Sequence, residues 1–363
     1  MMRRSAFRII AMVAAFVMTV GLATGCGAGT SEKPSTAETQ EAKSEGKLKE
    51  ETAAEAKDEK TKDKYVIGFS QTGTETEWVT AMSTEIIDSF DGASQFELLF
   101  SESQAIQENQ IKAVRSYIQQ GVDLIVLRPT VTTGWDSVLM EASEAGIPVI
   151  LAGRRVEMAT GNVEDYSLCY VGPDNVRAGE YLVEAMDKCC EAMEAPVNIV
   201  VLEGTVGASA ATERNTGILN AIEKQDKLVI YGSQSAEWTR TKGKEVMEAF
   251  LKSAEAEGVK IQGVLAHSDD MGLGAIQAIQ EAGMEPGKDI ILMGVDGARG
   301  SFEAMAEGKY NATVENPLGY GPALLDICQK YFLEGQKPDS WVVLDNIIWF
   351  QEQAAEELPK RTW

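Results

Sequence analysis

The stretch around residues 264–297 has the clearest pattern of apolar and polar positions, and it predicts a strand, a helix and a second strand. An apolar run at 261–266 has the length of a buried strand, and a second run follows at 290–295. Between them, apolar residues recur at helical spacing from 275 to 282, and Gly283 supplies a helix stop. This order predicts a strand–helix–strand unit of a parallel sheet.

Both loops of this unit are polar, and each follows the carboxyl end of a predicted strand. Ser268, Asp269 and Asp270 follow the first strand, and Asp296 follows the second. Ligands of open α/β sheets bind outside the carboxyl ends of the strands, so both loops are candidates for a binding site. From the loops alone, two plainer interpretations stay open. Asp269 or Asp270 accepts the free amide hydrogens at the helix start, and Asp296 with Gly297 forms only a turn.

The same alternation recurs along the rest of the chain and predicts two βα series in succession. Strands are expected at 65–70, 96–100, 124–127, 148–151, 197–202, 228–231, 261–266 and 290–295. Further helices are expected at 79–89, 106–120, 134–145, 177–190 and 241–253. Because strands and helices alternate, we expect an α/β fold in two similar lobes, each with a parallel sheet covered by helices on both faces.

The first residues have the pattern of a bacterial secretion signal. Arginines precede an apolar run at 9–20, which is too short for a good membrane span. The sequence Leu-Ala-Thr-Gly-Cys at 22–26 resembles a bacterial lipobox, which implies a signal peptide at 1–25 and a lipid anchor on Cys26. Ordinary secretion with an unmodified Cys26 is the alternative. Residues 26–63 are polar and lack aromatic side chains, so we expect a disordered tether after the lipidated cysteine.

Charge and cysteine usage exclude several classes of function. The net charge of −23 argues against nucleic-acid binding, which needs a basic face. His267 is the only histidine, and no cysteine pair has metal-ligand spacing, so we expect no metal and no cofactor. The sequence leaves open whether the cysteines beyond Cys26 are paired. They are Cys169, Cys189, Cys190 and Cys328.

Six motifs then identify a family. They are KYVIGFSQTGTETEW, ENQIKAVRSYIQQGVDLIVLRPTVTTGW, LEGTVGASAATER, SQSAEWTRTKGKEVMEAF, AHSDDMGLGAIQAIQEAG and MGVDG. In this order and spacing they resemble the type I periplasmic sugar-binding proteins, the solute receptors of sugar ABC transporters. Within that family the galactofuranose-binding members are the most similar, and the ribose-binding members are more distant. The resemblance covers residues 65 to about 357.

The resemblance implies a particular architecture. It implies two Rossmann-like parallel-sheet lobes joined by three crossovers, near 172–175, 315–317 and 344–347, that close on a sugar by hinge bending. The N-terminal lobe is expected to comprise residues 64–172 plus 316–345. The C-terminal lobe is expected to comprise residues 173–315 plus 346–357.

The resemblance also implies the site. The expected ligand-binding residues are Ser70, Gln71, Trp78, Arg154, Arg214, Trp238, Ser268, Asp269, Asp296 and Asn316. The two tryptophans are expected to stack on the C–H faces of a sugar, while the charged and amide groups bind its hydroxyls. Trp135 is given no sugar role by the resemblance and is expected to pack in a lobe.

Some positions depart from the family pattern. Gly153 and Ser268 stand where relatives have Asp and Asn, and Val79 stands where galactofuranose-binding members have Arg. Arg128 stands where ribose-binding members have Asn. Arg128 and Arg155 are candidates to fill the vacated space, for an acidic or differently shaped sugar. The motif match implies a hexose or pentose monosaccharide, with galactofuranose first, and these departures put the identity of the sugar in question.

These observations favour a binding protein over an enzyme. His267, Ser268 and Asp269 are consecutive, and consecutive side chains on an extended loop point in opposite directions, so they are not expected to form a catalytic triad. We expect a monomeric extracytoplasmic lipoprotein that delivers its sugar to the permease of an ABC importer. It is expected on the outer face of a single-membrane bacterium or in a periplasm. The alternative is a sensory receptor that presents the sugar to a membrane histidine kinase or chemoreceptor.

Overall fold

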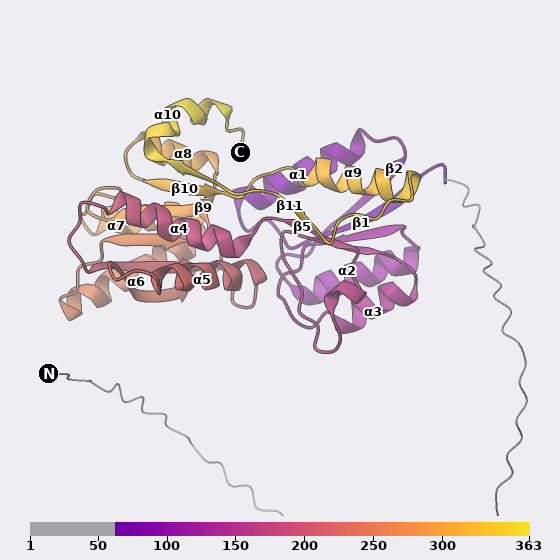
Figure 1. The fold of residues 1–363 in the computed structure, drawn as a ribbon, viewed down its shortest axis with the longest axis horizontal. Helices are drawn as coiled ribbons and strands as arrows, with labels where there is room; N and C mark the ends of the chain where they lie inside the picture. Colours follow the sequence, from indigo (N-terminus) through magenta and orange to yellow (C-terminus); the bar gives the residue numbers. More distant parts are fainter. Residues whose placement is uncertain (1–61) are drawn as a thin grey trace, which may run out of the picture. The chain divides into compact units, whose positions relative to one another are not determined.

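The computed structural model describes residues 62–363, which form two sheets of mostly parallel strands with helices packed on them (Figure 1). The expected signal peptide, Cys26 and nearly all of the expected tether lie outside the described residues. Between residues 62 and 363, no helix has the length and apolar character needed to cross a membrane.

The first sheet has the strand order β11-β5-β4-β3-β1-β2, and all of its neighbouring strands are parallel. Its strands are β1 (Tyr65–Gln71), β2 (Phe96–Glu102), β3 (Leu124–Leu127), β4 (Val149–Ala152), β5 (Cys169–Gly172) and β11 (Trp341–Val343). Its helices are α1 (Glu77–Asp91), α2 (Gln107–Gln120), α3 (Asp136–Glu144) and α9 (Tyr320–Leu333).

Strand β3 explains why this sheet is covered on both faces. All four of its residues are buried. Leu124 and Val126 pack in a cluster with residues of α1 and α9, whereas Ile125 and Leu127 pack in a second cluster with residues of α2 and α3. Side chains of a strand alternate between faces, so a continuous apolar run needs helices on both sides. Figure 1 shows the two helix pairs on opposite sides of the strands. Trp135 packs in the α2–α3 cluster.

The second sheet has the order β12-β10-β9-β8-β6-β7, with β12 antiparallel to β10. Its strands are β6 (Val197–Glu203), β7 (Leu228–Ser235), β8 (Gly263–Ala266), β9 (Ile291–Asp296), β10 (Ala312–Glu315) and β12 (Ile347–Phe350). Its helices are α4 (Asn175–Cys189), α5 (Ser209–Ile222), α6 (Arg240–Glu257), α7 (Asp269–Glu281), α8 (Arg299–Ala306) and α10 (Ala354–Glu357). The short 3₁₀ turns are η1 (Val163–Asp165), η2 (Gln351–Gln353) and η3 (Leu358–Lys360).

The chain passes between the two sheets three times: after β5, after β10 and after β11. Helices α4 and α5 cover one face of the second sheet, and α6 and α7 cover the other. The predicted α/β fold of two parallel-sheet lobes with three crossovers is therefore confirmed.

The start of α7 differs from the prediction that Asp269 or Asp270 caps this helix. Ser268 is the N-cap, and its Oγ accepts a hydrogen bond from the backbone amide of Met271 at 3.4 Å. Ser268 has the extended backbone conformation that aims a short hydroxyl at the first helical turn. Asp269 is already inside the helix and is fully buried, so its carboxylate is free to serve another contact.

Candidate functional site

A polar cavity lies where loops from both sheets meet. Its cavity volume is only about 20 Å³, so the lining side chains nearly close it, and the wider unfilled space of about 300 Å³ includes open solvent. Its lining residues are Glu75, Thr76, Trp78, Val79, Arg128, Arg154, Ala210, Arg214, Trp238, Asp296 and Asn316. Most of them follow the carboxyl ends of β1, β3, β4, β7, β9 and β10 or begin the next helix. This is the edge at which open α/β sheets bind ligands.

The first tryptophan of the cavity is anchored by the backbone. Trp78 lies in the first turn of α1, which Thr76 caps by accepting a hydrogen bond from the amide of Val79 at 3.2 Å. The indole Nε1 of Trp78 donates to the backbone oxygen of Asn316 at 2.6 Å. Only the ring of Trp78 is therefore available to a ligand. The guanidinium carbon of Arg128 lies 5.5 Å from its ring centroid.

The second tryptophan occupies space that a glycine leaves open. A Cβ atom on Gly204 would lie 2.0 Å from a ring carbon of Trp238, so only glycine permits this packing. Trp238 itself has a backbone φ of +66°, a conformation that costs energy for a residue with a side chain. Its buried Nε1 has no hydrogen-bond partner among the described residues. The loop thus holds an unpaired indole N–H at the cavity.

Three buried arginines converge on the cavity. Arg128 donates from Nη1 to the Oγ1 of Thr72 at 2.7 Å, and Arg154 donates to the backbone oxygen of Thr130 at 3.2 Å. Arg214, on α5, donates to the backbone oxygen of His267. Burial and then the neighbouring Arg128 lower the pKa of Arg154 to about 9.

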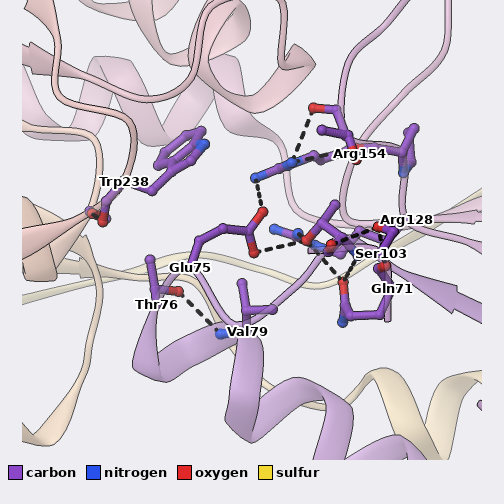
Figure 2. Close-up of polar contacts among 12 residues, drawn as sticks. Gln71, Glu75, Thr76, Val79, Ser103, Arg128, Arg154 and Trp238 are labelled. Carbon is purple, nitrogen blue, oxygen red and sulfur yellow. Dashed lines mark hydrogen bonds and ion pairs between the residues drawn. The ribbon is translucent and has the colours of Figure 1, made fainter. Parts of the chain in front are cut away.

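Two carboxylates face these arginines. Figure 2 shows the carboxylate of Glu75 pointing toward Arg154, whose Nη2 lies 3.9 Å from Glu75 Oε1. Burial opposes ionisation of Glu75, but Arg154 and Arg128 outweigh it and lower the pKa of that carboxyl. Burial raises the pKa of Asp296 well above its ordinary value, although Arg214 opposes the shift. Asp296 also has a backbone φ of +129°, so the strand end is strained at this residue.

Several polar atoms at this cavity lack partners in the protein. The Nε atoms of the three arginines, Trp238 Nε1 and Asn316 Oδ1 are buried and form no hydrogen bond with any residue in 62–363. Buried polar groups are almost always paired. A ligand that offers several hydrogen-bonding groups and an apolar face between them satisfies this arrangement.

The structure brings six of the ten predicted residues to the cavity. They are Trp78, Arg154, Arg214, Trp238, Asp296 and Asn316. Ser70, Gln71, Ser268 and Asp269 are buried but do not line it. Gln71 is engaged within its own lobe, because its amide donates to Ser83 Oγ at 2.9 Å and its oxygen accepts from the backbone amide of Thr72 at 2.9 Å.

Asp269 does not line the cavity but accepts hydrogen bonds from the loop next to Asp296. Its Oδ2 accepts hydrogen bonds from the backbone amides of Gly297 at 2.9 Å and Ala298 at 3.0 Å. The hydroxyls of Thr313 and Tyr310 donate to the same carboxyl group, at 2.9–3.0 and 3.2 Å. Asp269 thereby fixes the loop that directly follows Asp296.

Arg155 does not fill the space at Gly153. Its guanidinium carbon lies 3.8 Å from the ring centroid of Tyr170 and 4.6 Å from that of Trp341, and its Nε lies 3.6 Å from Glu213. These residues line a separate hollow. The prediction that Arg155 shares this role with Arg128 is therefore wrong, because consecutive residues point to different sides of the loop.

Sequence reasoning did not select Glu75, Thr76 or Ala210 as ligand contacts. Glu75 was the easiest to find, since it is an acid in the polar loop that follows the buried strand β1. Arg128 carries a similar signal, because it directly follows the fully buried strand β3.

The consecutive residues His267, Ser268 and Asp269 bind other parts of the protein rather than one another. His267 accepts from the backbone amide of Gly204 at 3.3 Å, and Ser268 donates to the backbone oxygen of Trp238 at 3.3 Å. No hydrogen bond joins the side chains of His267, Ser268 and Asp269 into a triad. In the part of the chain that the structure describes, no group of three or more His, Cys, Asp and Glu side chains is placed to hold a metal ion.

The sequence is similar to a known protein family and to several characterised proteins. The profile of the periplasmic binding protein domain matches residues 67–337. The galactofuranose-binding protein YtfQ of Escherichia coli is 43% identical over 298 residues, which are 81% of this chain and 91% of that protein. The ribose import binding protein RbsB of Bacillus subtilis is 34% identical over 221 residues, 60% of this chain and 65% of that protein.

Solved structures agree with these relatives. The binding protein of the arabinose ABC transporter from Shewanella sp. ANA-3, bound to α- and β-L-arabinofuranose, has a TM-score of 0.75 and 40% identity, covering 82% of this chain and 95% of that one. The fructose-binding periplasmic domain of a hybrid two-component system has a TM-score of 0.73 and 25% identity, covering 82% of this chain and 94% of that domain.

Proposed function

This chain belongs to the periplasmic binding protein family, and we propose that it captures a monosaccharide, a hexose or pentose, outside the cytoplasm and delivers it to an ABC importer. The observation that supports this most strongly is the cavity itself. Two tryptophans, three arginines and two carboxylates surround it, and several of their buried polar atoms have no protein partner. Aromatic faces with hydrogen-bonding groups between them suit a ring that carries hydroxyls.

A panel of free monosaccharides tests this proposal by thermal unfolding. A ligand at a hundred times its dissociation constant adds about 2.7 kcal/mol to the free energy of unfolding. The midpoint then rises by several degrees, at roughly 2–4 °C per kcal/mol for domains of 150–250 residues. Galactofuranose and arabinofuranose are included, because similar proteins bind furanoses. If no sugar raises the midpoint while an amino acid, nucleoside or inositol does, the sugar assignment is wrong.

We place the lobe boundaries at 64–172 plus 316–345 and at 173–315 plus 346–357, and we propose that the lobes close on the sugar. Two hydrogen bonds between the proposed lobes favour a closed form. Thr132 donates from its backbone amide to the oxygen of Gly207 at 2.8 Å, and the amide of Arg155 donates to Ser209 Oγ at 2.7 Å. Small-angle scattering should give a smaller radius of gyration with saturating sugar than without it. Equal radii in the presence of a sugar shown to bind would contradict closure.

We also propose that the protein is a monomeric lipoprotein, anchored through Cys26 to the outer face of the cell membrane or in a periplasm. The lipobox at 22–26 and the polar stretch that follows support the anchor. The protein's direct partners would be the membrane and the permease of the importer. Sugar uptake by cells that carry or lack the gene tests the transport role.

A sensory role is the second candidate, because a domain of similar fold belongs to a two-component system. In that role the closed, sugar-loaded protein presents its surface to a membrane histidine kinase or chemoreceptor. Deleting the gene then abolishes the response of sugar-induced transcription or chemotaxis while uptake of the sugar stays normal. Loss of uptake with normal signalling supports the importer.

A further inference from the structure

The charges that line the cavity do not balance. Arg128, Arg154 and Arg214 contribute three positive charges, whereas Glu75 and Asp296 contribute at most two negative ones. All three guanidinium groups are almost completely buried. An uncompensated charge in a buried site is costly, and a ligand that supplies the missing charge removes that cost.

Two buried donors without partners lie close together beside Gly153. A Cβ atom added to Gly153 would lie 3.2 Å from Tyr320 Oη and 3.5 Å from Arg128 Nε. Both atoms are buried and have no hydrogen-bond partner among the described residues. Two unpaired donors thus lie within reach of one tight point beside Gly153, which we call the Arg128–Gly153–Tyr320 corner, and a group that binds there must replace a van der Waals contact with hydrogen bonds.

We propose that the physiological ligand is a sugar acid, and that its carboxylate binds at the Arg128–Gly153–Tyr320 corner. This inference rests on the proposed sugar-binding function and narrows it to one class of sugar. The Nε edge of a guanidinium binds carboxylates in a charge-assisted geometry, and a tyrosine hydroxyl is a further donor to the same group.

The neighbouring acids do not occupy this corner. Glu75 faces Arg154 at 3.9 Å, and Asp296 lies in the field of Arg214. Glu85 does not line the cavity, because its carboxylate accepts the backbone amides of Gly319 and Gly321 at 2.8–3.1 Å. Among residues 62–363, no carboxylate lies within ion-pair distance of Arg128, although its charge helps to lower the pKa of Glu75.

Size, rather than charge, favours a carboxylate over a phosphate, because the raised pKa of Asp296 leaves the excess positive charge between one and two. A phosphate monoester carries three terminal oxygens, one more than a carboxylate. The cavity is also small, and a carboxylate adds little volume to a monosaccharide.

Calorimetric titration of the purified chain with matched sugars tests the inference. The pairs are D-galactose with D-galacturonate, D-glucose with D-glucuronate, and D-mannose with D-mannuronate, with D-galactose 6-phosphate as a further probe. At least one acid should bind about tenfold to 150-fold more tightly than its neutral partner, the range expected for one charge-assisted hydrogen bond. The phosphate should bind more weakly than that acid.

Two variants at one position separate charge from shape. Gly153 has a backbone φ of +70°, which Asp and Asn tolerate better than other side chains. Gly153→Asp places a carboxylate beside Arg128 and should abolish the preference for the acid. Gly153→Asn has nearly the same shape without the charge and should keep the preference, even if all sugars bind more weakly.

Three results would overturn the inference while leaving the proposed function intact. They are a neutral sugar that binds as tightly as its acid, tightest binding by the phosphate, or a Gly153→Asp variant that keeps the wild-type preference. If no neutral or acidic sugar binds at all, the sugar-binding function fails together with the inference.

Discussion

Trp78 and Asn316 link the first helix of one sheet to the segment where the chain leaves the other. The indole Nε1 of Trp78 donates to the backbone oxygen of Asn316 at 2.6 Å, although 238 positions separate them in sequence. Both residues line the cavity. A ligand that stacks on Trp78 therefore touches a residue that is already bonded to a crossover.

Trp78→Phe keeps an aromatic face but leaves the oxygen of Asn316 without its buried donor. We expect the free energy of unfolding without sugar to fall by about 1–3 kcal/mol, and sugar affinity to fall as well. Chemical denaturation and calorimetric titration measure the two effects. Trp135→Phe is the matched control, because Trp135 also donates to a backbone oxygen, at 2.7 Å, but packs in the core of the first sheet. It should lower stability without changing affinity, and an affinity loss in both variants would contradict this role of Trp78.

Asp296→Ala removes the one carboxylate that the second sheet contributes to the cavity. We expect affinity for the bound sugar to fall about tenfold to 150-fold, since a charged hydrogen bond is worth roughly 1.5–3 kcal/mol. Asp187→Ala, on the exposed face of α4, is the control and should bind normally. Normal affinity in a folded Asp296→Ala protein would show that Asp296 does not contribute to sugar binding.

His267 should make the protein sensitive to acid. Burial, and then the charge of Arg214, lower the pKa of His267 to about 3. Between pH 3 and the ordinary value of about 6.5, the unfolded chain binds a proton that the folded protein does not, so stability falls as the pH falls through this window. The slope approaches about 1.4 kcal/mol per pH unit for one proton.

His267→Asn retains a side-chain acceptor for the amide of Gly204, which lies 3.3 Å from His267 Nδ1. The variant is expected to lose less stability than the wild type between pH 6.5 and 5, whatever its stability at neutral pH. Urea unfolding at several pH values measures the difference. Parallel curves for the two proteins would show that His267 titrates normally.

Arg240 joins α6 to residues at the start of α7 and α1. Its Nη2 lies 2.8 Å from Asp270 Oδ1 and 3.3 Å from Glu77 Oε1, and the amide of Glu77 donates to Asp270 at 3.1 Å. The cluster is exposed, so each pair contributes at most about 1 kcal/mol. Only the pair with Glu77 joins helices of different sheets, so Arg240→Ala should weaken sugar binding by no more than about fivefold, with the larger loss at low salt. Lys242→Ala removes an exposed pair within α6 alone and should leave affinity unchanged.

Cys26→Ser tests the anchor. The variant is expected to leave the membrane fraction, or to accumulate with its signal uncleaved, because serine cannot carry the thioether-linked lipid. Fractionation and immunoblotting of cells measure both outcomes. Mature-sized variant protein that remains with membranes would refute a lipid anchor at this residue.

The strands within the two βα series were predictable, whereas the four strands next to the crossovers were not. Strand β3 occupies the predicted residues 124–127, because a run of four buried apolar side chains has few alternatives in an α/β chain. Strands β5, β10, β11 and β12 have three or four residues each and were not predicted as strands. Their pairing depends on where the chain crosses between sheets, which local pattern does not determine.

The loops that form the site could be predicted from the sequence, but not which of their side chains line the cavity. Asp296 and Arg214 were selected from their positions and line the cavity. Asp269 was selected for the same reason, yet its carboxylate binds Thr313, 44 positions away. Only the tertiary structure determines which side chain of a polar loop faces the ligand and which faces the sheet.

The chain returns to the first sheet only after β10, so the strands of that sheet are not made one directly after another. Strand β5 is complete at Gly172, but its outer neighbour β11 is formed by Trp341–Val343. A chain that emerges from its amino end therefore exposes the edge of β5 while the whole second sheet up to β10 is being made. Unpaired strand edges attract other strands. The first sheet of this protein is consequently complete only after Val343 has been made.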